Sequence, residues 1–120
     1  MGPIWDFDWA YGFESGSVHF INPNDDLFWT GSRAGIGTIF FSRLMSDPKI
    51  QLLIQEHWGD FKTNHLEELT VYIDDYAFII EGAKARNLVL WNAGRVNDVE
   101  VMKQWLEDRV QYMDNFMLTF

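Results

Sequence analysis

Two carboxylates near the start of the chain, Asp6 and Asp8, are the residues whose type and spacing most clearly indicate chemistry. They are one residue apart in the string Gly2-Pro3-Ile4-Trp5-Asp6-Phe7-Asp8-Trp9-Ala10-Tyr11-Gly12. If residues 4–8 are extended, both side chains point to one side of the backbone, as alternate residues of a strand do. They could then share a hard cation such as Mg²⁺, with phosphate oxygens and water as its other ligands. The pattern indicates a phosphoryl-transfer metal site; the alternative is that either Asp caps a turn or accepts hydrogen bonds from backbone amides.

A glycine-rich segment, residues 31–37, is a second candidate site. Its sequence is Gly31-Ser32-Arg33-Ala34-Gly35-Ile36-Gly37. Glycines allow an anion to approach backbone amides, the following helix would present its N-terminus, and Arg33 would add positive charge. The spacing matches neither common phosphate-loop pattern, so an ordinary connection before a helix is the competing interpretation. Arg33 is the candidate nucleotide-binding residue.

The three histidines, His19, His57 and His65, do not form a metal-ligand pattern. They make no i, i+4 pair and no His-Glu-x-x-His motif, which are the helical arrangements that bind zinc. His57 falls on the apolar side of a predicted helix, next to Trp58, where we expect a hydrogen-bonded and partly buried imidazole. No local pattern indicates a hydrolase.

The elements that must position these residues change in character near residue 35. Residues 1–35 are rich in Gly, Asn, Asp and aromatic residues, with extended candidates only at 4–8 and 17–21. Asn22-Pro23-Asn24-Asp25 predicts a turn, because proline fixes φ and Asn and Asp side chains bond locally to the backbone. We therefore expect an irregular, partly extended N-terminal arm that carries the Asp-Phe-Asp motif.

The apolar spacing of residues 36–120 predicts a mainly α structure, a bundle of about four helices. The first is short and ends near Ser46; the second begins at Pro48, with Asp47 as its N-cap. The third runs from about Asn64 to about Trp91, and the last begins after residue 97 or 98. The second helix is expected to turn the following side chains toward the core: Ile50, Leu53, Ile54, His57, Trp58 and Phe61. Arm and helices together form one domain, residues 1–120.

Composition excludes several classes of protein. The chain has 120 residues, a net charge of −9 and a pI near 4.5, which argues against nucleic acid, because phosphate-backbone binding depends on Lys and Arg clusters. It has no cysteine, so disulfides, thiolate nucleophiles and Cys-bound zinc are excluded. No apolar run approaches the roughly 18 residues that span a bilayer. Aromatic residues make up 17% of the chain, enough that some are expected to cover a partner or a ligand.

The opening string closely resembles the metal-binding motif of the spore-coat CotH family of atypical protein kinases, a Gly-Pro-x-Trp-Asp-(Phe/Tyr)-Asp segment that takes the place of the kinase Asp-Phe-Gly motif. Four later segments resemble further signatures of that family in the same order. They are Phe41-Ser42-Arg43-Leu44-Met45-Ser46-Asp47-Pro48, Tyr72-Ile73-Asp74, Asn87 with Trp91, and Trp105-Leu106-Glu107-Asp108-Arg109.

The resemblance implies a protein that transfers phosphate from ATP to Ser residues of protein substrates, with Mg²⁺ or Mn²⁺ bound at Asp6 and Asp8 assisting. It also implies a spore coat, cell-surface or secreted location. A kinase needs a phosphate-binding Lys, a cover over the nucleotide and a positioning Asp, all of which precede the metal motif. None can be placed before Asp6. We therefore expect the C-terminal part of a longer protein, inactive alone, whose partners are the missing N-terminal kinase portion and a protein substrate.

A different class of protein also fits the composition. A non-enzymatic helical module could use a Trp-rich surface to bind carbohydrate or protein by stacking. Exposed aromatic residues could equally drive self-association. The acidic pairs at 67–68, 74–75 and 107–108 are expected to be solvated, or to receive a basic substrate tail. Arg109, one turn after Trp105, is expected to stack or to pair with an Asp or Glu of a neighbouring helix, a structural role.

Overall fold

Helices make up most of the chain that the structure describes. The computed structural model describes residues 22–27, 35–91 and 99–120. Its helices are α1 (Ile36–Leu44), α2 (Pro48–Asn64), α3 (Leu66–Ile79), α4 (Glu81–Trp91) and α5 (Val99–Met117). Those three ranges contain no strand. The prediction of a mainly α protein is confirmed, whereas the extended segments predicted at 4–8 and 17–21 lie outside the described residues.

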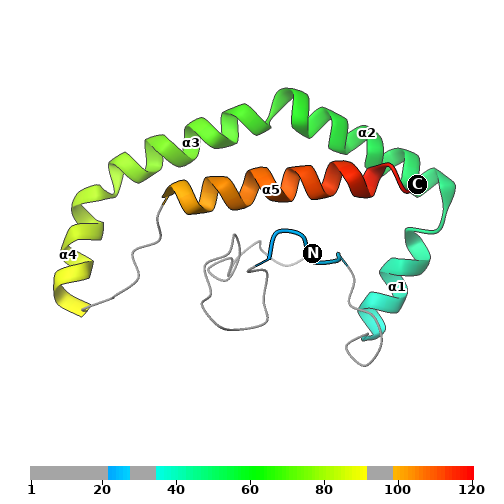
Figure 1. Cartoon of the computed structure of the whole chain (residues 1–120), viewed down its shortest axis with the longest axis horizontal. Coiled ribbons are helices and arrows are strands. Elements are labelled where there is room, and N and C mark those ends of the chain that lie inside the picture. Colours follow the sequence, from blue (N-terminus) through cyan, green and yellow to red (C-terminus); the bar gives the residue numbers. More distant parts are fainter. Residues whose placement is uncertain (1–21, 28–34, 92–98) are drawn as a thin grey trace.

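The helices are arranged as an arch over a single supporting helix. Figure 1 shows α2, α3 and α4 following one another in a continuous arc, with α5 running back along its inner side. Helix α5 is antiparallel to the arc, so its C-terminal end lies near the beginning of α2. Helix α1 projects from the α2 end of the arch. Helix α5 lies along α2 and α3, whereas α4 continues the arc beyond the start of α5.

Helix α2 begins where the sequence predicts. Asp47 has extended backbone angles, and its Oδ1 accepts a hydrogen bond of 2.8 Å from the backbone N–H of Lys49. Pro48 occupies the first helical position, where a backbone N–H would have no hydrogen-bond partner within the helix, so its absence costs nothing. The Asp-Pro pair therefore separates α1 from α2.

The predicted long third helix is wrong in one respect, because it is divided into α3 and α4. The division falls at Ile80, whose φ and ψ of −91° and 1° are outside the α-helical range. Helical hydrogen bonds continue through it, since the Ile80 N–H donates to Tyr76 O at 3.0 Å and the Lys84 N–H to Ile80 O at 2.8 Å. Gly82, in the first turn of α4, lowers the helix propensity there. The result is a bend in a helical path, so that residues 35–91 and 99–120 contain five helices.

The apolar interior is thin. Of the described residues, Met117 near the end of α5 is the only buried hydrophobic side chain, with 7% of its surface exposed. Half-buried side chains from α2 include Ile54, Trp58 and Phe61, and the rings of Trp58 and Phe61 stack with centroids 5.5 Å apart. The prediction for two other residues of that helix is wrong, because Leu53 and His57 are exposed. Their positions lie on the outer edge of the predicted stripe, beyond the reach of α5.

Candidate functional site

The residues that the sequence predicts as functional lie outside the described part of the chain. This applies to Asp6, Asp8 and Arg33, and also to His19. The structure does describe residues 22–27, the segment between the two candidate sites in sequence. The last residues of the glycine-rich candidate segment, 35–37, are also described: Gly35 is the N-cap of α1, with no side-chain hydrogen bond to the cap, and α1 begins at Ile36.

Residues 22–25 form the predicted turn. The Asn22 Oδ1 accepts a 3.0 Å hydrogen bond from the Asn24 N–H, and its Nδ2 donates to Asp25 Oδ1 at 2.9 Å. The Asp25 N–H closes the turn on Asn22 O at 3.2 Å. Asn bonding to the backbone two residues ahead is the interaction that makes it a frequent turn residue. The turn therefore has hydrogen bonds of its own, in addition to its contacts with α5.

Arg109 of α5 binds the backbone of this turn. Its Nη1 donates to the carbonyl oxygens of Pro23 at 2.8 Å and Asp25 at 2.6 Å. Burial lowers the pKa of Arg109, although guanidinium stays charged at any physiological pH. Hydrogen bonds from a charged donor are roughly twice as strong as neutral ones. Arg109 therefore binds two residues that lie 86 and 84 positions before it in sequence.

Tyr112 completes this contact from one turn further along α5. The Arg109 guanidinium lies over its ring, 4.5 Å from the centroid, and the Tyr112 hydroxyl donates to Asp26 Oδ1 at 3.3 Å. Burial raises the pKa of Tyr112, and the nearby negative charge of Asp26 adds to the effect. We call Arg109, Tyr112 and residues 22–27 the α5 anchor.

A second set of contacts joins α5 to α2. Asp114 accepts hydrogen bonds from Trp58 Nε1 at 2.7 Å and from Lys62 Nζ, whose shortest distance is 2.7 Å. The Lys62 ammonium is the main cause of a lowered pKa for Asp114. Gln55 Nε2 also donates to Met117 O at 2.8 Å, close to the C-terminal end of α5.

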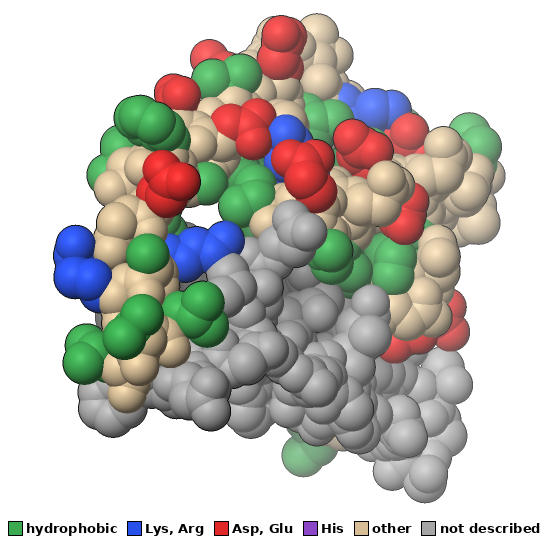
Figure 2. Space-filling view, turned by 60° about the vertical axis from the view of Figure 1, so that its left-hand side comes forward, with side chains coloured by type: hydrophobic (Ala, Val, Ile, Leu, Met, Phe, Trp, Pro, Cys, Tyr) green, Lys and Arg blue, Asp and Glu red, His purple; other side chains and the backbone are tan. Residues whose placement is uncertain are grey.

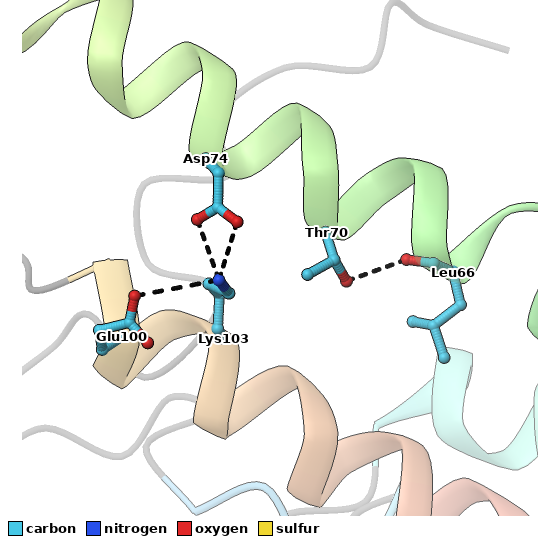
Figure 3. A network of polar contacts seen from close by, with 5 residues as sticks. All are labelled: Leu66, Thr70, Asp74, Glu100 and Lys103. Carbon is cyan, nitrogen blue, oxygen red and sulfur yellow. Dashed lines mark hydrogen bonds and ion pairs between the residues drawn. The ribbon is translucent and has the colours of Figure 1, made fainter.

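A third set joins α5 to α3 (Figure 3). The Lys103 ammonium donates to both oxygens of Asp74 at 2.9 Å and lies 3.9 Å from Glu100. The hydrogen bond to Asp74 raises the pKa of Lys103. Thr70, one turn before Asp74, donates back to Leu66 O within α3 at 3.0 Å. Helix α5 is thus fixed to the turn at 22–27, to α2 and to α3.

Across residues 22–27, 35–91 and 99–120, no group of three or more His, Asp or Glu side chains could hold a metal ion. His65, at the junction of α2 and α3, lies 3.7 Å from Asp60 and 3.5 Å from Glu68, and all three are well exposed. Within the same ranges no helix is long and apolar enough to cross a membrane.

Comparison with protein-family models, with curated proteins and with solved structures found no match to this chain. Its function must therefore be argued from its own residues and geometry.

The sequence correctly predicted a structural role for Arg109, but it did not predict the groups that Arg109 binds. Arg109 was expected to stack or to pair with an Asp or Glu of a neighbouring helix. Its guanidinium does lie over an aromatic ring, that of Tyr112, but its hydrogen bonds go to two backbone carbonyls of a distant turn. Every residue carries a carbonyl, so these partners leave no signal in the sequence. The α2–α5 link through Asp114 was also missed, although Trp58 and Lys62 at i, i+4 spacing put both donors on one face of α2.

Proposed function

We propose that the chain is the C-terminal portion of a CotH-like protein kinase. In this proposal Asp6 binds Mg²⁺ or Mn²⁺ together with ATP, and Asp8 assists. The whole protein transfers phosphate to Ser residues of a protein substrate. The observation that carries the proposal is the string around Asp6 and Asp8, followed in order by the later segments that resemble the family.

The architecture supports this division of roles. Three of the later segments fall at junctions or contact points of the fold: Asp47-Pro48 begins α2, Asp74 binds Lys103, and Arg109 binds the turn at 22–27. A metal site needs ligands held in fixed positions by their surroundings. The α5 anchor supplies a fixed point on the chain between the Asp pair and Arg33. The helices then serve as scaffold for a site whose remaining parts come from another portion of the kinase.

The proposal is tested by metal and nucleotide binding, because binding does not require turnover. Isothermal titration of the chain with Mn²⁺ and ATP, singly and together, should detect a metal–nucleotide complex that Asp6→Asn abolishes and Asp8→Asn weakens. Glu56→Gln removes the same charge from an exposed position of α2 and should bind as the native chain does. Asp6→Asn binding as tightly as the native chain would contradict the metal role.

The alternative of an aromatic binding module makes the opposite prediction at Asp6. Stacking of a sugar ring or a protein segment on Trp side chains should survive Asp6→Asn unchanged. Of the described tryptophans, Trp58 is half-buried and occupied by Asp114 and Phe61. The Trp58 side chain is therefore already engaged within the fold, whereas Trp5, Trp9 and Trp29 lie outside the described residues.

A further inference from the structure

The outer face of α3 is an exposed apolar surface with a carboxylate at its centre. The face opposite α5 consists of Glu68, Val71, Tyr72, Asp75, Phe78 and Ile79, all of them exposed. Phe78 and Ile79 have 79% and 72% of their surface accessible to solvent. Figure 2 shows hydrophobic side chains interspersed with acidic and basic ones over the upper part of that view. Exposed apolar side chains gathered on one face of a helix are a feature of interaction sites.

Asp75 sets the chemistry of this face. On a helix, residues three and four positions apart are neighbours, so Asp75 lies among Val71, Tyr72, Phe78 and Ile79. Helix α3 contains no Lys, Arg or His. Among the described residues Asp75 has no hydrogen-bond or ion-pair partner. Covering the face would leave a buried, unpaired carboxylate unless the partner supplies a cation. The fitting partner is therefore an apolar segment with one basic side chain.

Helix α1 of this same chain has that chemistry. Ile36, Ile39, Phe40 and Arg43 follow one another at spacings of three, one and three residues, which places them on one side of the helix. All four are exposed, and Ile36 has 90% of its surface accessible. Arg43 is the only charged residue of α1. In the part of the chain that the structure describes, its side chain has no ion-pair partner.

We propose that two copies of this chain associate by docking α1 of each copy on the outer face of α3 of the other, with Arg43 paired to Asp75. The two faces are complementary in charge and similar in apolar character. Within one copy, α1 and α3 lie apart on the arch (Figure 1), so the faces meet only between copies.

A two-fold dimer repeats each contact. It would bury both faces of both copies, four apolar helical surfaces in all. Stable interfaces bury roughly 800 Å² per partner. We expect the two helix-on-helix contacts together to bury an area of this order. The Arg43–Asp75 pair then neutralises the carboxylate at the centre of each contact and opposes alternative pairings of two acidic faces.

Charge reversal tests the pairing without altering the interior, because both residues are exposed. Sedimentation equilibrium of the native chain should show a monomer–dimer equilibrium. Arg43→Glu and Asp75→Arg should each weaken dimerisation by about tenfold or more, since each places two like charges in contact twice per dimer. An equimolar mixture of the two variants should form heterodimers with native affinity, because every contact in the mixed dimer again joins opposite charges. Arg86→Glu and Glu56→Arg are matched reversals at exposed positions outside both faces.

The proposal is overturned by any of three results. A native chain that remains monomeric has no such interface. Reversals that act no more strongly than Arg86→Glu and Glu56→Arg would place the interface elsewhere. Single variants that fail to recover in the mixture would show that Arg43 and Asp75 do not face each other. Far-UV circular dichroism of each variant confirms that the helices are retained, and Phe78→Asn should weaken association with no change in charge.

Discussion

Replacing Arg109 by alanine should release residues 22–27 from α5. The substitution removes two hydrogen bonds from a charged donor, at 2.8 Å and 2.6 Å, and the contact with the ring of Tyr112. Hydrogen bonds to charged groups contribute about 1.5–3 kcal/mol each, and a partly exposed cation–π contact about 0.5–1 kcal/mol. Pro23 and Asp25 are half-buried, so water can partly replace the lost donor. We therefore expect a net loss of about 2–3 kcal/mol.

Hydrogen exchange followed by mass spectrometry measures this loss where it occurs. At 1.4 kcal/mol for each factor of ten, amides of residues 22–27 should exchange on the order of 30- to 150-fold faster in Arg109→Ala. Arg109→Lys keeps the charge but loses the planar fork, and should give an intermediate rate. Global stability should change less, because the turn can detach while the arch remains folded.

Arg86→Ala is the control, since Arg86 is exposed on α4 and has no hydrogen-bond or ion-pair partner among the described residues. It should leave the exchange of residues 22–27 at the native rate. Equal exchange in the native chain, Arg86→Ala and Arg109→Ala would refute the reasoning, because it would mean that Arg109 does not hold the turn in solution.

Three further predictions concern the contacts of α5. Asp114→Asn should cost about 1 kcal/mol at neutral pH, since the carboxylate is about one-third exposed. Because Lys62 lowers the pKa of Asp114 below its ordinary 3.8, this contribution is present above pH 3.8 and disappears as the pH falls through the lower folded-state value; urea unfolding curves of the two proteins should converge in acid. Met117→Ala should lower the free energy of unfolding by about 2 kcal/mol. This is the low end of the range for replacing a core methionine by alanine, because few buried side chains surround Met117. A urea midpoint equal to that of the native chain would contradict this prediction. The pKa of Lys103 is raised by Asp74, so its contribution is present below the ordinary 10.5 and is lost as the pH rises through the higher folded-state value; Lys103→Met should lack that alkaline loss in thermal unfolding.

Local signals in the sequence predicted the local structure well. The start of α2 at Pro48 and the turn at residues 22–25 both depend on side chains bonding to backbone within two residues. Such interactions are fully encoded in a short stretch of sequence. The bend at Ile80 was missed because the apolar spacing continues across it, and spacing alone does not distinguish a straight helix from a bent one.

Longer-range features could be predicted only in part. His57 was placed on the inner stripe of α2 by its spacing, but a single antiparallel helix covers a narrower strip than a closed bundle would, which leaves it exposed. The metal site at Asp6 and Asp8 and the nucleotide site at Arg33 remain predictions, since those residues lie outside the described ranges. The anchor at Arg109 could not be predicted, because its acceptors are backbone atoms.

The dependence of the arch on α5 has a consequence for how the chain acquires its structure during synthesis. Gln55, Trp58 and Lys62 of α2 and Asp74 of α3 all form hydrogen bonds to α5, and they lie 29 to 62 positions earlier in sequence than their partners. A ribosome releases α2, α3 and α4 before α5 exists. The sides of α2 and α3 that contact α5 therefore stay exposed until α5 emerges. The long-range contacts then form together in one late step. Nascent chains stalled before residue 99 should accordingly bind general chaperones more strongly than chains in which α5 has emerged.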